Sequence, residues 1–220
     1  MTLKLYFHPL SSFCMKTLIA LYENDTPFER EIVDLSNATS RDAFKKIWPI
    51  GKFPVLHDSA KDRMIPESSV IIEYLDQNYP GKMRFIPSEA DLARQTRLRD
   101  RFFDLHVHLH MQKIVGDRLR PPGKSDPHGV EDAVARVQTA LGMIEGDMAT
   151  KTWAMGEEFT LADCSAGPPL FYVNKLKPFD GSLMNTRRYL DRLMARPSFA
   201  RALKEAQPYF AMFPQERAAS

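Results

Sequence analysis

Hydrophobic and polar residues follow two different patterns along the chain, and the change falls at about residue 80. Before it, short apolar runs alternate with stretches whose apolar residues recur at helical spacing. The pattern predicts strands at Leu3–Phe7, Phe28–Val33, Pro54–His57 and Arg63–Ile65, and helices at Ser12–Asn24, Arg41–Ile47 and Ser68–Asn78. Strands and helices in this order indicate a small mixed α/β sheet covered by helices.

The rest of the chain has an almost wholly helical pattern. It follows "NYPGKMRFIP", residues 78–87, where two prolines and a glycine indicate a domain boundary. In the first predicted helix, Glu89–Asp117, the apolar residues fit one long amphipathic helix; they are Leu92, Leu98, Phe102, Leu105, Leu109 and Val115. Further helices are predicted at Val130–Met148, Leu161–Val173, Leu183–Ala195 and Ser198–Glu205. We therefore predict a first domain at 1–80, a linker at 81–88 and an all-helical domain at 89–220.

Composition adds few constraints to this picture. The 220 residues are 44% hydrophobic and 26% charged, as expected for a folded globular protein. The net charge of +2 does not indicate a nucleic-acid partner, and the arginines at 94, 97, 99 and 101, interleaved with Asp100 and Asp104, are interpreted as a solvated helix face. No apolar run approaches the roughly 20 residues of a membrane span. The start "MTLKLYF" lacks the features of a secretory signal, and Cys14 and Cys164 form no paired motif, so we expect a cytoplasmic protein.

The stretch "HPLSSFC" carries the candidate chemistry. Ser11 and Ser12 stand where the first strand leads into the first helix, and the free amide groups of a helix N-terminus favour an anion. A phosphate is disfavoured because the stretch has no glycine, whereas a serine hydroxyl can donate to a thiolate. That thiolate could belong to a ligand or to Cys14. Alternatively, a serine simply caps the helix and Cys14 is a small buried residue.

Two further stretches carry a family resemblance. Together with "SSFCMKTLIALYE", the boundary loop and the predicted capping box "FTLADC", the stretches "GKFPVLHD" and "IPESSVIIEYLDQNYP" resemble the cytosolic glutathione transferases over essentially the whole chain. Ser11 followed by Cys14 is similar to the serine-type classes, as in a theta-, zeta-, tau- or delta-like bacterial member. Tyr6, within the first strand, remains a minor rival to Ser11 because tyrosine-type members carry their catalytic group near that point.

The resemblance implies a thioredoxin-like first domain that binds glutathione as a co-substrate. It implies a cis peptide bond before Pro54, which lets the backbone of Phe53 pair with the cysteinyl part of glutathione, and Lys52 beside its glycine carboxylate. Glu67 and Ser68 would hold the charged γ-glutamyl end, although the same residues also fit an ordinary capped helix start. Ser11, with Ser12 as the alternative, would stabilise the thiolate that attacks a small hydrophobic electrophile.

The electrophile pocket is expected between the two domains. Its candidate wall residues are Leu10, Phe103, His106 and His110. "HVHLH" is not interpreted as a metal site, because His106 and His110 share a helix face while His108 points elsewhere, and no metal is expected. The resemblance also implies a homodimer. Two other functions stay open: a thiol-disulfide reductase with Cys14 as nucleophile, and a non-catalytic glutathione-binding protein of the same fold.

Overall fold

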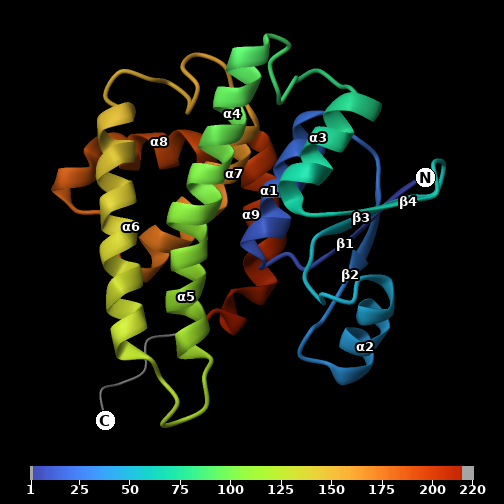
Figure 1. Ribbon diagram of the computed structural model, residues 1–220, viewed down its shortest axis with the longest axis horizontal. Helices are drawn as coiled ribbons and strands as arrows, with labels where there is room; N and C mark the ends of the chain where they lie inside the picture. The colour runs from blue at the N-terminus through green and yellow to red at the C-terminus, as the bar shows by residue number, and fades with distance from the viewer. Residues whose placement is uncertain (1, 215–220) are drawn as a thin grey trace.

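The computed structural model describes residues 2–214. A small α/β domain comes first in the chain and lies beside a larger bundle of helices (Figure 1). The first domain contains β1 (Leu3–Phe7), α1 (Ser12–Glu23), β2 (Glu29–Ile32), α2 (Ala38–Ile47), β3 (Val55–Asp58), β4 (Arg63–Pro66) and α3 (Ser68–Asn78). All seven predicted elements of this domain are present, with ends that differ by up to three residues.

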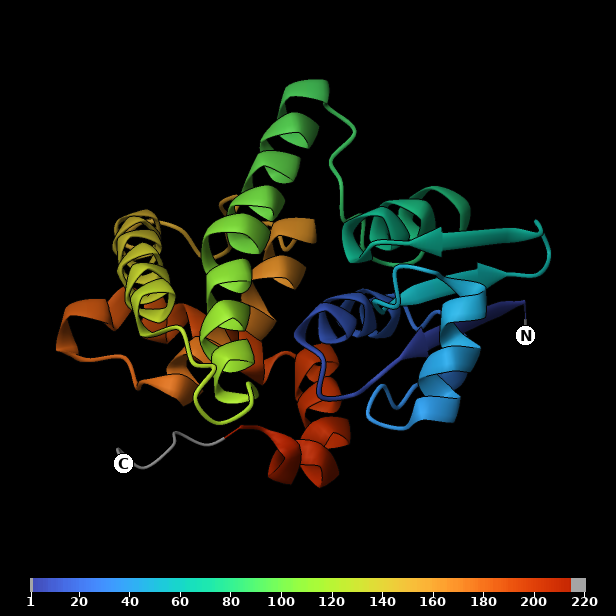
Figure 2. The ribbon, with the colours of Figure 1, turned by 60° about the horizontal axis from the view of Figure 1, so that its bottom comes forward.

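The sheet has four strands in the order β2-β1-β3-β4. β1 and β2 are parallel, whereas β1–β3 and β3–β4 are antiparallel. Leu5 and Phe7 of β1 belong to the core that contains α1 and α3, while Tyr6 packs with Phe44 of α2 in a second cluster. Successive strand residues face opposite sides of the sheet, so Leu5 and Phe7 lie on one face and Tyr6 on the other. Helices cover both faces (Figure 2).

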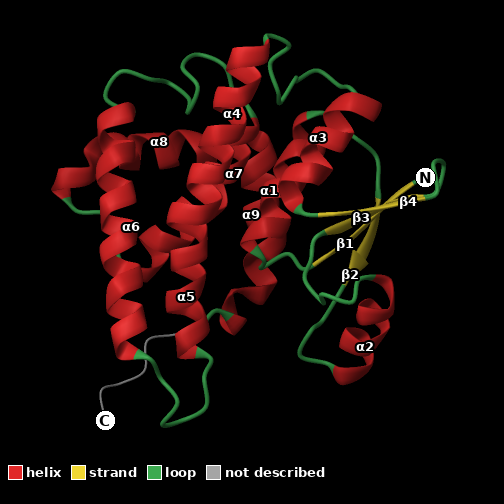
Figure 3. Cartoon of the chain, viewed as in Figure 1, coloured by secondary structure: helices red, strands yellow, loops and turns green. Residues whose placement is uncertain are grey.

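The helical domain begins with α4 (Ala90–Phe102), which continues through the π-helical segment η1 (Phe103–His108) into α5 (Leu109–Arg118). The remaining elements are α6 (Pro127–Asp147), α7 (Leu161–Leu176), η2 (Gly181–Leu183), α8 (Met184–Ala195), α9 (Pro197–Ala206) and η3 (Gln207–Met212) (Figure 3). The predicted capping box at the start of α7 is confirmed, since Thr160 N donates to Asp163 Oδ2 at 2.9 Å and Ala162 N donates to Thr160 Oγ1. No helix among residues 2–214 is both long and apolar enough to cross a membrane.

The long helical stretch from α4 to α5 turns a different face to the core from the one expected. Leucines assigned to its apolar stripe are exposed; they are Leu92, Leu98, Leu105 and Leu109. Its buried face includes Asp100, Asp104 and His108. The prediction that Asp100 and Asp104 lie on a solvated face is therefore wrong. The apolar period indicated a helix correctly, but polar partners on α1 and α3 decide which face is buried.

Candidate functional site

Three loops of the first domain meet at one end of the sheet. In the antiparallel register, Tyr6 of β1 pairs with Val55 of β3, and Val55 pairs with Pro66 of β4. The residues that follow Tyr6, precede Val55 and follow Pro66 therefore lie at the same end of the sheet. This end combines the β1–α1 corner, the Phe53–Pro54 turn and the start of α3.

Ser11 is the N-cap of α1. Its Oγ accepts from the backbone amide of Cys14 at 3.4 Å, and its own amide donates to the His8 carbonyl at 3.0 Å. Ser11 is half-buried, so its hydroxyl lies next to the free amides of the first helical turn and still reaches solvent. The helix dipole makes this corner attractive for an anion.

Ser12 has a different environment. It is buried, and its Oγ lies 2.5 Å from Nε2 of His108 in the helical domain. The ring of Phe13 stacks on the His108 ring, with centroids 3.6 Å apart and planes inclined by 16°. The N-terminus of α1 is therefore attached to the helical domain through Ser12 and Phe13.

His108 is the histidine of "HVHLH" that faces the first domain, on a different side of the helix from His106 and His110, as expected. It is buried, whereas His106 is exposed beside Phe102 and His110 is half-buried. Residues 103–108 form a π-helical segment within the long helical stretch. A π turn is wider than an α turn, which changes the face on which later side chains emerge.

The hydrogen-bonding role of His108 follows from its surroundings. Burial, reinforced by the positive charge of Lys16, lowers the pKa of His108 well below its ordinary value, so the ring is neutral at pH 7. Nδ1 lies 3.9 Å from Asp104 Oδ1, and neither atom has a hydrogen-bond partner within residues 2–214. The neutral ring carries one proton, so Nε2 either accepts from the Ser12 hydroxyl or donates to it, depending on the tautomer.

A buried ion cluster lies behind the same corner and was missed in the sequence. Lys16 Nζ contacts Asp100 Oδ1 at 2.6 Å, Asp104 Oδ2 at 2.8 Å and Ser69 Oγ at 2.8 Å. Arg101 also pairs with Asp104. Burial alone would raise the pKa of Asp100, but Lys16 and the hydrogen bonds from Ser165 and Ser69 together outweigh it and the pKa is lowered. A lysine within the apolar run "MKTLIAL" was the available signal, since a buried lysine needs an acidic partner.

The cis peptide bond between Phe53 and Pro54 is confirmed. Pro54 is buried, Phe53 is half-buried and Lys52 is exposed just before them. The Phe53 ring lies 6.3 Å from that of His8, at the end of β1. The turn therefore stands directly beside the β1–α1 corner.

Glu67 and Ser68 begin α3, as expected. Glu67 has φ 71° and ψ 117°, a conformation that non-glycine residues rarely adopt, and its carboxylate makes no capping hydrogen bond to α3. The interpretation of Glu67 as an ordinary helix cap is therefore wrong. Ser68 is buried, while the Glu67 side chain is exposed. Backbone strain of this kind costs about 1–3 kcal/mol and concentrates at binding sites.

Cys14 lies in the core of the first domain and is 0% exposed. Burial raises the pKa of its thiol to about 12, more than the hydrogen bond with Ser11 lowers it. At neutral pH the group is a protonated thiol without access to solvent. These properties oppose a role as nucleophile, because the thiolate is the reactive form.

The four predicted wall residues of the electrophile pocket have separate environments. Leu10 is half-buried beside Ser11, and its carbonyl accepts from the Tyr172 hydroxyl at 2.6 Å. Phe103 is part of the core, whereas His106 lines a cavity of about 630 Å³ between α4 and α6. The cavity that His106 lines includes none of Leu10, Phe103 and His110. Residues 2–214 contain no group of three or more His, Cys, Asp or Glu that could hold a metal ion.

Comparison with known proteins agrees with this architecture. Residues 5–83 match the family model "Glutathione S-transferase, N-terminal domain", and residues 103–197 match "Glutathione S-transferase, C-terminal domain". The chain therefore belongs to the glutathione S-transferase family and is an enzyme of that class.

Individual relatives are distant in sequence. Glutathione S-transferase GstB of Escherichia coli K12 is 24% identical over 184 residues, covering 83% of this chain and 88% of the relative. The glutathione S-transferase-like protein LUC7 of a Fusarium species is 30% identical over 157 residues, covering 71% and 68%. The crystal structure of a glutathione S-transferase from Methylobacillus flagellatus KT with glutathione bound has a TM-score of 0.82 at 26% identity, covering 91% of this chain and 98% of that one.

Proposed function

We propose that this enzyme conjugates glutathione to small hydrophobic electrophiles, with the glutathione sulfur held as a thiolate at Ser11. The observation that carries the proposal is the different environment of the two adjacent serines. Ser12 is buried and hydrogen-bonded to His108, whereas Ser11 caps α1 as an acceptor and is only half-buried, so its hydroxyl is the one that a ligand can reach. The related structure with bound glutathione supports the choice of thiol.

The energetic requirement for a thiolate at this corner is modest. A hydrogen bond to a charged group contributes about 1.5–3 kcal/mol. Since one pKa unit corresponds to about 1.4 kcal/mol, a thiol with a pKa near 8.5 would be brought to about 6.5–7.5. The thiol proton leaves to solvent on binding. The sulfur lone pair then forms the bond to the electrophilic carbon, while the bond from that carbon to its leaving group breaks and the group departs with the electron pair; in a conjugated acceptor the π pair shifts instead and takes a proton from solvent.

The rest of the tripeptide would lie along this end of the sheet, across the Phe53–Pro54 turn and the start of α3. The backbone of Phe53 pairs with the cysteinyl part, and Lys52 attracts the glycine carboxylate. At the other end, the uncapped Glu67 carboxylate holds the ammonium group, while Ser68 and the first amides of α3 hold the α-carboxylate. Two observations support this assignment: the Glu67 carboxylate makes no capping hydrogen bond to α3, and the side chain is exposed.

The electrophile would bind against Leu10 and Phe13, which flank the two serines. A homodimer is supported by apolar side chains that stay exposed on the neighbouring helices α3 and α4, such as Val70 at 53% and Leu98 at 62%. The free cysteines Cys14 and Cys164 suit a reducing compartment, and we place the enzyme in the cytoplasm.

The test is the ultraviolet absorbance of bound glutathione thiolate as a function of pH. In Ser11→Ala we expect the apparent pKa of the bound thiol to rise by about 1–2 units and kcat/KM at neutral pH to fall about 10–100-fold. Cys14→Ser serves as the control and should retain both values. Loss of turnover in Cys14→Ser alone would favour disulfide reduction. Glutathione binding without turnover across a panel of electrophiles would favour a binding protein.

A further inference from the structure

The loop that leads into Ser11 is a tight turn with two internal hydrogen bonds. The Ser11 amide donates to the His8 carbonyl at 3.0 Å, which is the hydrogen bond of a β-turn with Pro9 and Leu10 at its centre. The Leu10 amide donates to Nδ1 of the His8 ring at 3.2 Å. These two bonds leave the Leu10 carbonyl for a partner outside the turn.

That partner is Tyr172 of α7, in the helical domain. Its hydroxyl donates to the Leu10 carbonyl at 2.6 Å and so joins positions 162 apart in the chain. Tyr172 is 2% exposed, and its ring stacks on that of Phe213, with centroids 5.3 Å apart and planes inclined by 14°. Burial raises the pKa of the Tyr172 phenol, so the group keeps its proton and acts as a donor at neutral pH.

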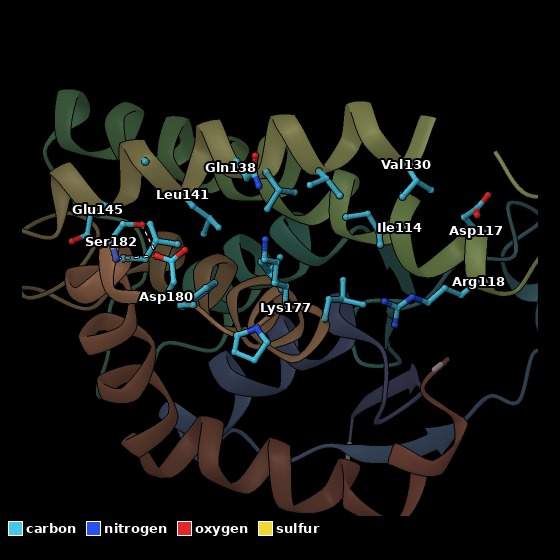
Figure 4. A pocket seen from close by; sticks show the side chains of 18 of the residues that line it. Ile114, Asp117, Arg118, Val130, Gln138, Leu141, Glu145, Lys177, Asp180 and Ser182 are labelled. Carbon is cyan, nitrogen blue, oxygen red and sulfur yellow. Dashed lines mark hydrogen bonds between the residues drawn. The ribbon is translucent and has the colours of Figure 1, made fainter. Parts of the chain in front are cut away.

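The end of α7 faces two different parts of the molecule. Val173, Leu176 and Lys177 line a cavity of about 1460 Å³ between α5, α6 and the segment that follows α7 (Figure 4). Tyr172 instead reaches the first domain. Because its side chain is buried and its proton is donated to a carbonyl, Tyr172 can affect a ligand only through the turn.

The hydrogen bond from Tyr172 acts on the peptide group that precedes Ser11. The Leu10 carbonyl and the Ser11 amide belong to one planar trans peptide unit, so they point in opposite directions. Tyr172 holds the carbonyl side of this unit, and the His8 carbonyl holds the amide side. With both sides held, the plane does not rotate, and the Ser11 side chain that follows it keeps one direction. The contact between a hydroxyl and a reacting sulfur depends on such fixed geometry.

We propose that Tyr172 is a positioning residue, which holds the Leu10–Ser11 peptide group so that the Ser11 hydroxyl points at the glutathione sulfur. The inference rests on the proposed function, because it extends the role given there to Ser11. It assigns to the helical domain a part in ionising the thiol. Without the Tyr172 hydroxyl, the peptide group would tilt, the Ser11 hydroxyl would spend less time on the sulfur, and the pKa of the bound thiol would rise.

The variant Tyr172→Phe removes the hydroxyl and keeps the ring on Phe213. From the absorbance of bound thiolate, we expect the apparent pKa of the thiol to rise by about 0.5 units and kcat at neutral pH to fall about threefold. At about pH 9 the kcat values of variant and parent should agree within about twofold, because the thiol is then ionised in both. KM for glutathione should stay within about twofold, because the residues proposed to hold the ends of the tripeptide are unchanged.

Tyr22→Phe is the matched control. The Tyr22 hydroxyl also connects the first domain to a helix of the second, since it donates to Glu205 of α9 at 2.7 Å, but it lies near the opposite end of α1 from Ser11. Tyr22→Phe should leave the thiol pKa and kcat unchanged. If the two variants alter the thiol pKa and kcat equally, Tyr172 has only a general structural role and the proposal is wrong.

The double variant Ser11→Ala with Tyr172→Phe separates this inference from the proposed function. If Tyr172 acts through Ser11, its substitution should raise the thiol pKa no further once the Ser11 hydroxyl is absent. An equal rise with and without Ser11, or no rise in Tyr172→Phe alone, would overturn the role of Tyr172 and leave that of Ser11 intact. If Ser11→Ala itself leaves the pKa unchanged, the proposed function fails and the positioning role fails with it.

Discussion

The Ser12 hydroxyl of the first domain lies 2.5 Å from His108 Nε2 of the helical domain, and both residues are buried. This contact joins the first turn of α1 to a π-helical segment 96 residues later in the chain. It distinguishes the adjacent serines: Ser12 attaches the β1–α1 corner to the helical domain, whereas Ser11 is half-buried and reaches solvent. The geometry of the corner therefore depends on the helical domain as well as on α1 itself.

The Ser12–His108 contact should be measurable in a double-mutant cycle. His108→Phe retains an aromatic ring against Phe13 but leaves the buried Ser12 hydroxyl without its hydrogen-bond partner. We expect the free energy of unfolding in urea to fall by about 1–3 kcal/mol. Ser12→Ala combined with His108→Phe should cost clearly less than the sum of the two single changes. Additive losses would show that the two side chains do not interact.

His108 should also make stability depend on pH. The pKa of His108 is lowered in the folded protein. Below the ordinary histidine value of about 6.5, the unfolded chain therefore binds a proton that the folded chain does not bind. The free energy of unfolding should therefore be fully present above that pH and decline as the pH falls below it, by at most about 1.4 kcal/mol per unit.

Urea titrations between about pH 7.5 and about pH 5, from about one unit above the ordinary histidine value to about 1.5 units below it, test this dependence. His108→Phe should flatten the decline in this range, whereas His128→Gln, which removes an exposed histidine at the start of α6, should leave it unchanged. An identical decline in His108→Phe would assign the pH dependence to another group.

Lys16 should be critical for folding because it neutralises buried carboxylates from the other domain. Lys16→Met keeps an unbranched side chain but leaves Asp100 and Asp104 without the ammonium, with Arg101 still beside Asp104. Removal of one partner from a buried ion pair costs about 3–5 kcal/mol. Lys4→Met, which breaks the exposed pair with Glu29 on the sheet, provides the matched control and should leave the urea midpoint essentially unchanged. Equal midpoints for both variants would contradict a structural role for the cluster.

The order of strands and helices was predictable because it depends on local periodicity. The helix start at Ser68 and the capping box at Thr160 depend on neighbours only a few residues apart, and both were predicted correctly. The cis bond at Pro54 came from the family resemblance, since its local sequence does not require it.

The contacts that shape the candidate site depend on residues far apart in the chain. Lys16 meets Asp100 across 84 positions, and Ser12 meets His108 across 96. Periodicity assigned the long helix correctly, but it placed the exposed Leu98 in the core and the buried Asp100 at the surface. Which face of a helix is buried is decided by its tertiary partners, and a single sequence shows no pairing between distant residues.

Glu67 offers the most direct test of how glutathione would be held. Glu67→Gln removes the negative charge but keeps a side chain of the same size, so we expect KM for glutathione to rise about tenfold, equivalent to about 1.4 kcal/mol of binding free energy. The change in kcat should be small, because the ammonium group is remote from the sulfur and the interaction is the same in ground and transition states. Glu131→Gln, which neutralises an exposed carboxylate on α6, is the control.

Glu67→Gly adds a second readout: glycine adopts φ 71° without penalty, so stability should be retained or increase while KM still rises. A variant that loses stability and keeps its KM would show that Glu67 supports the start of α3 and takes no part in binding.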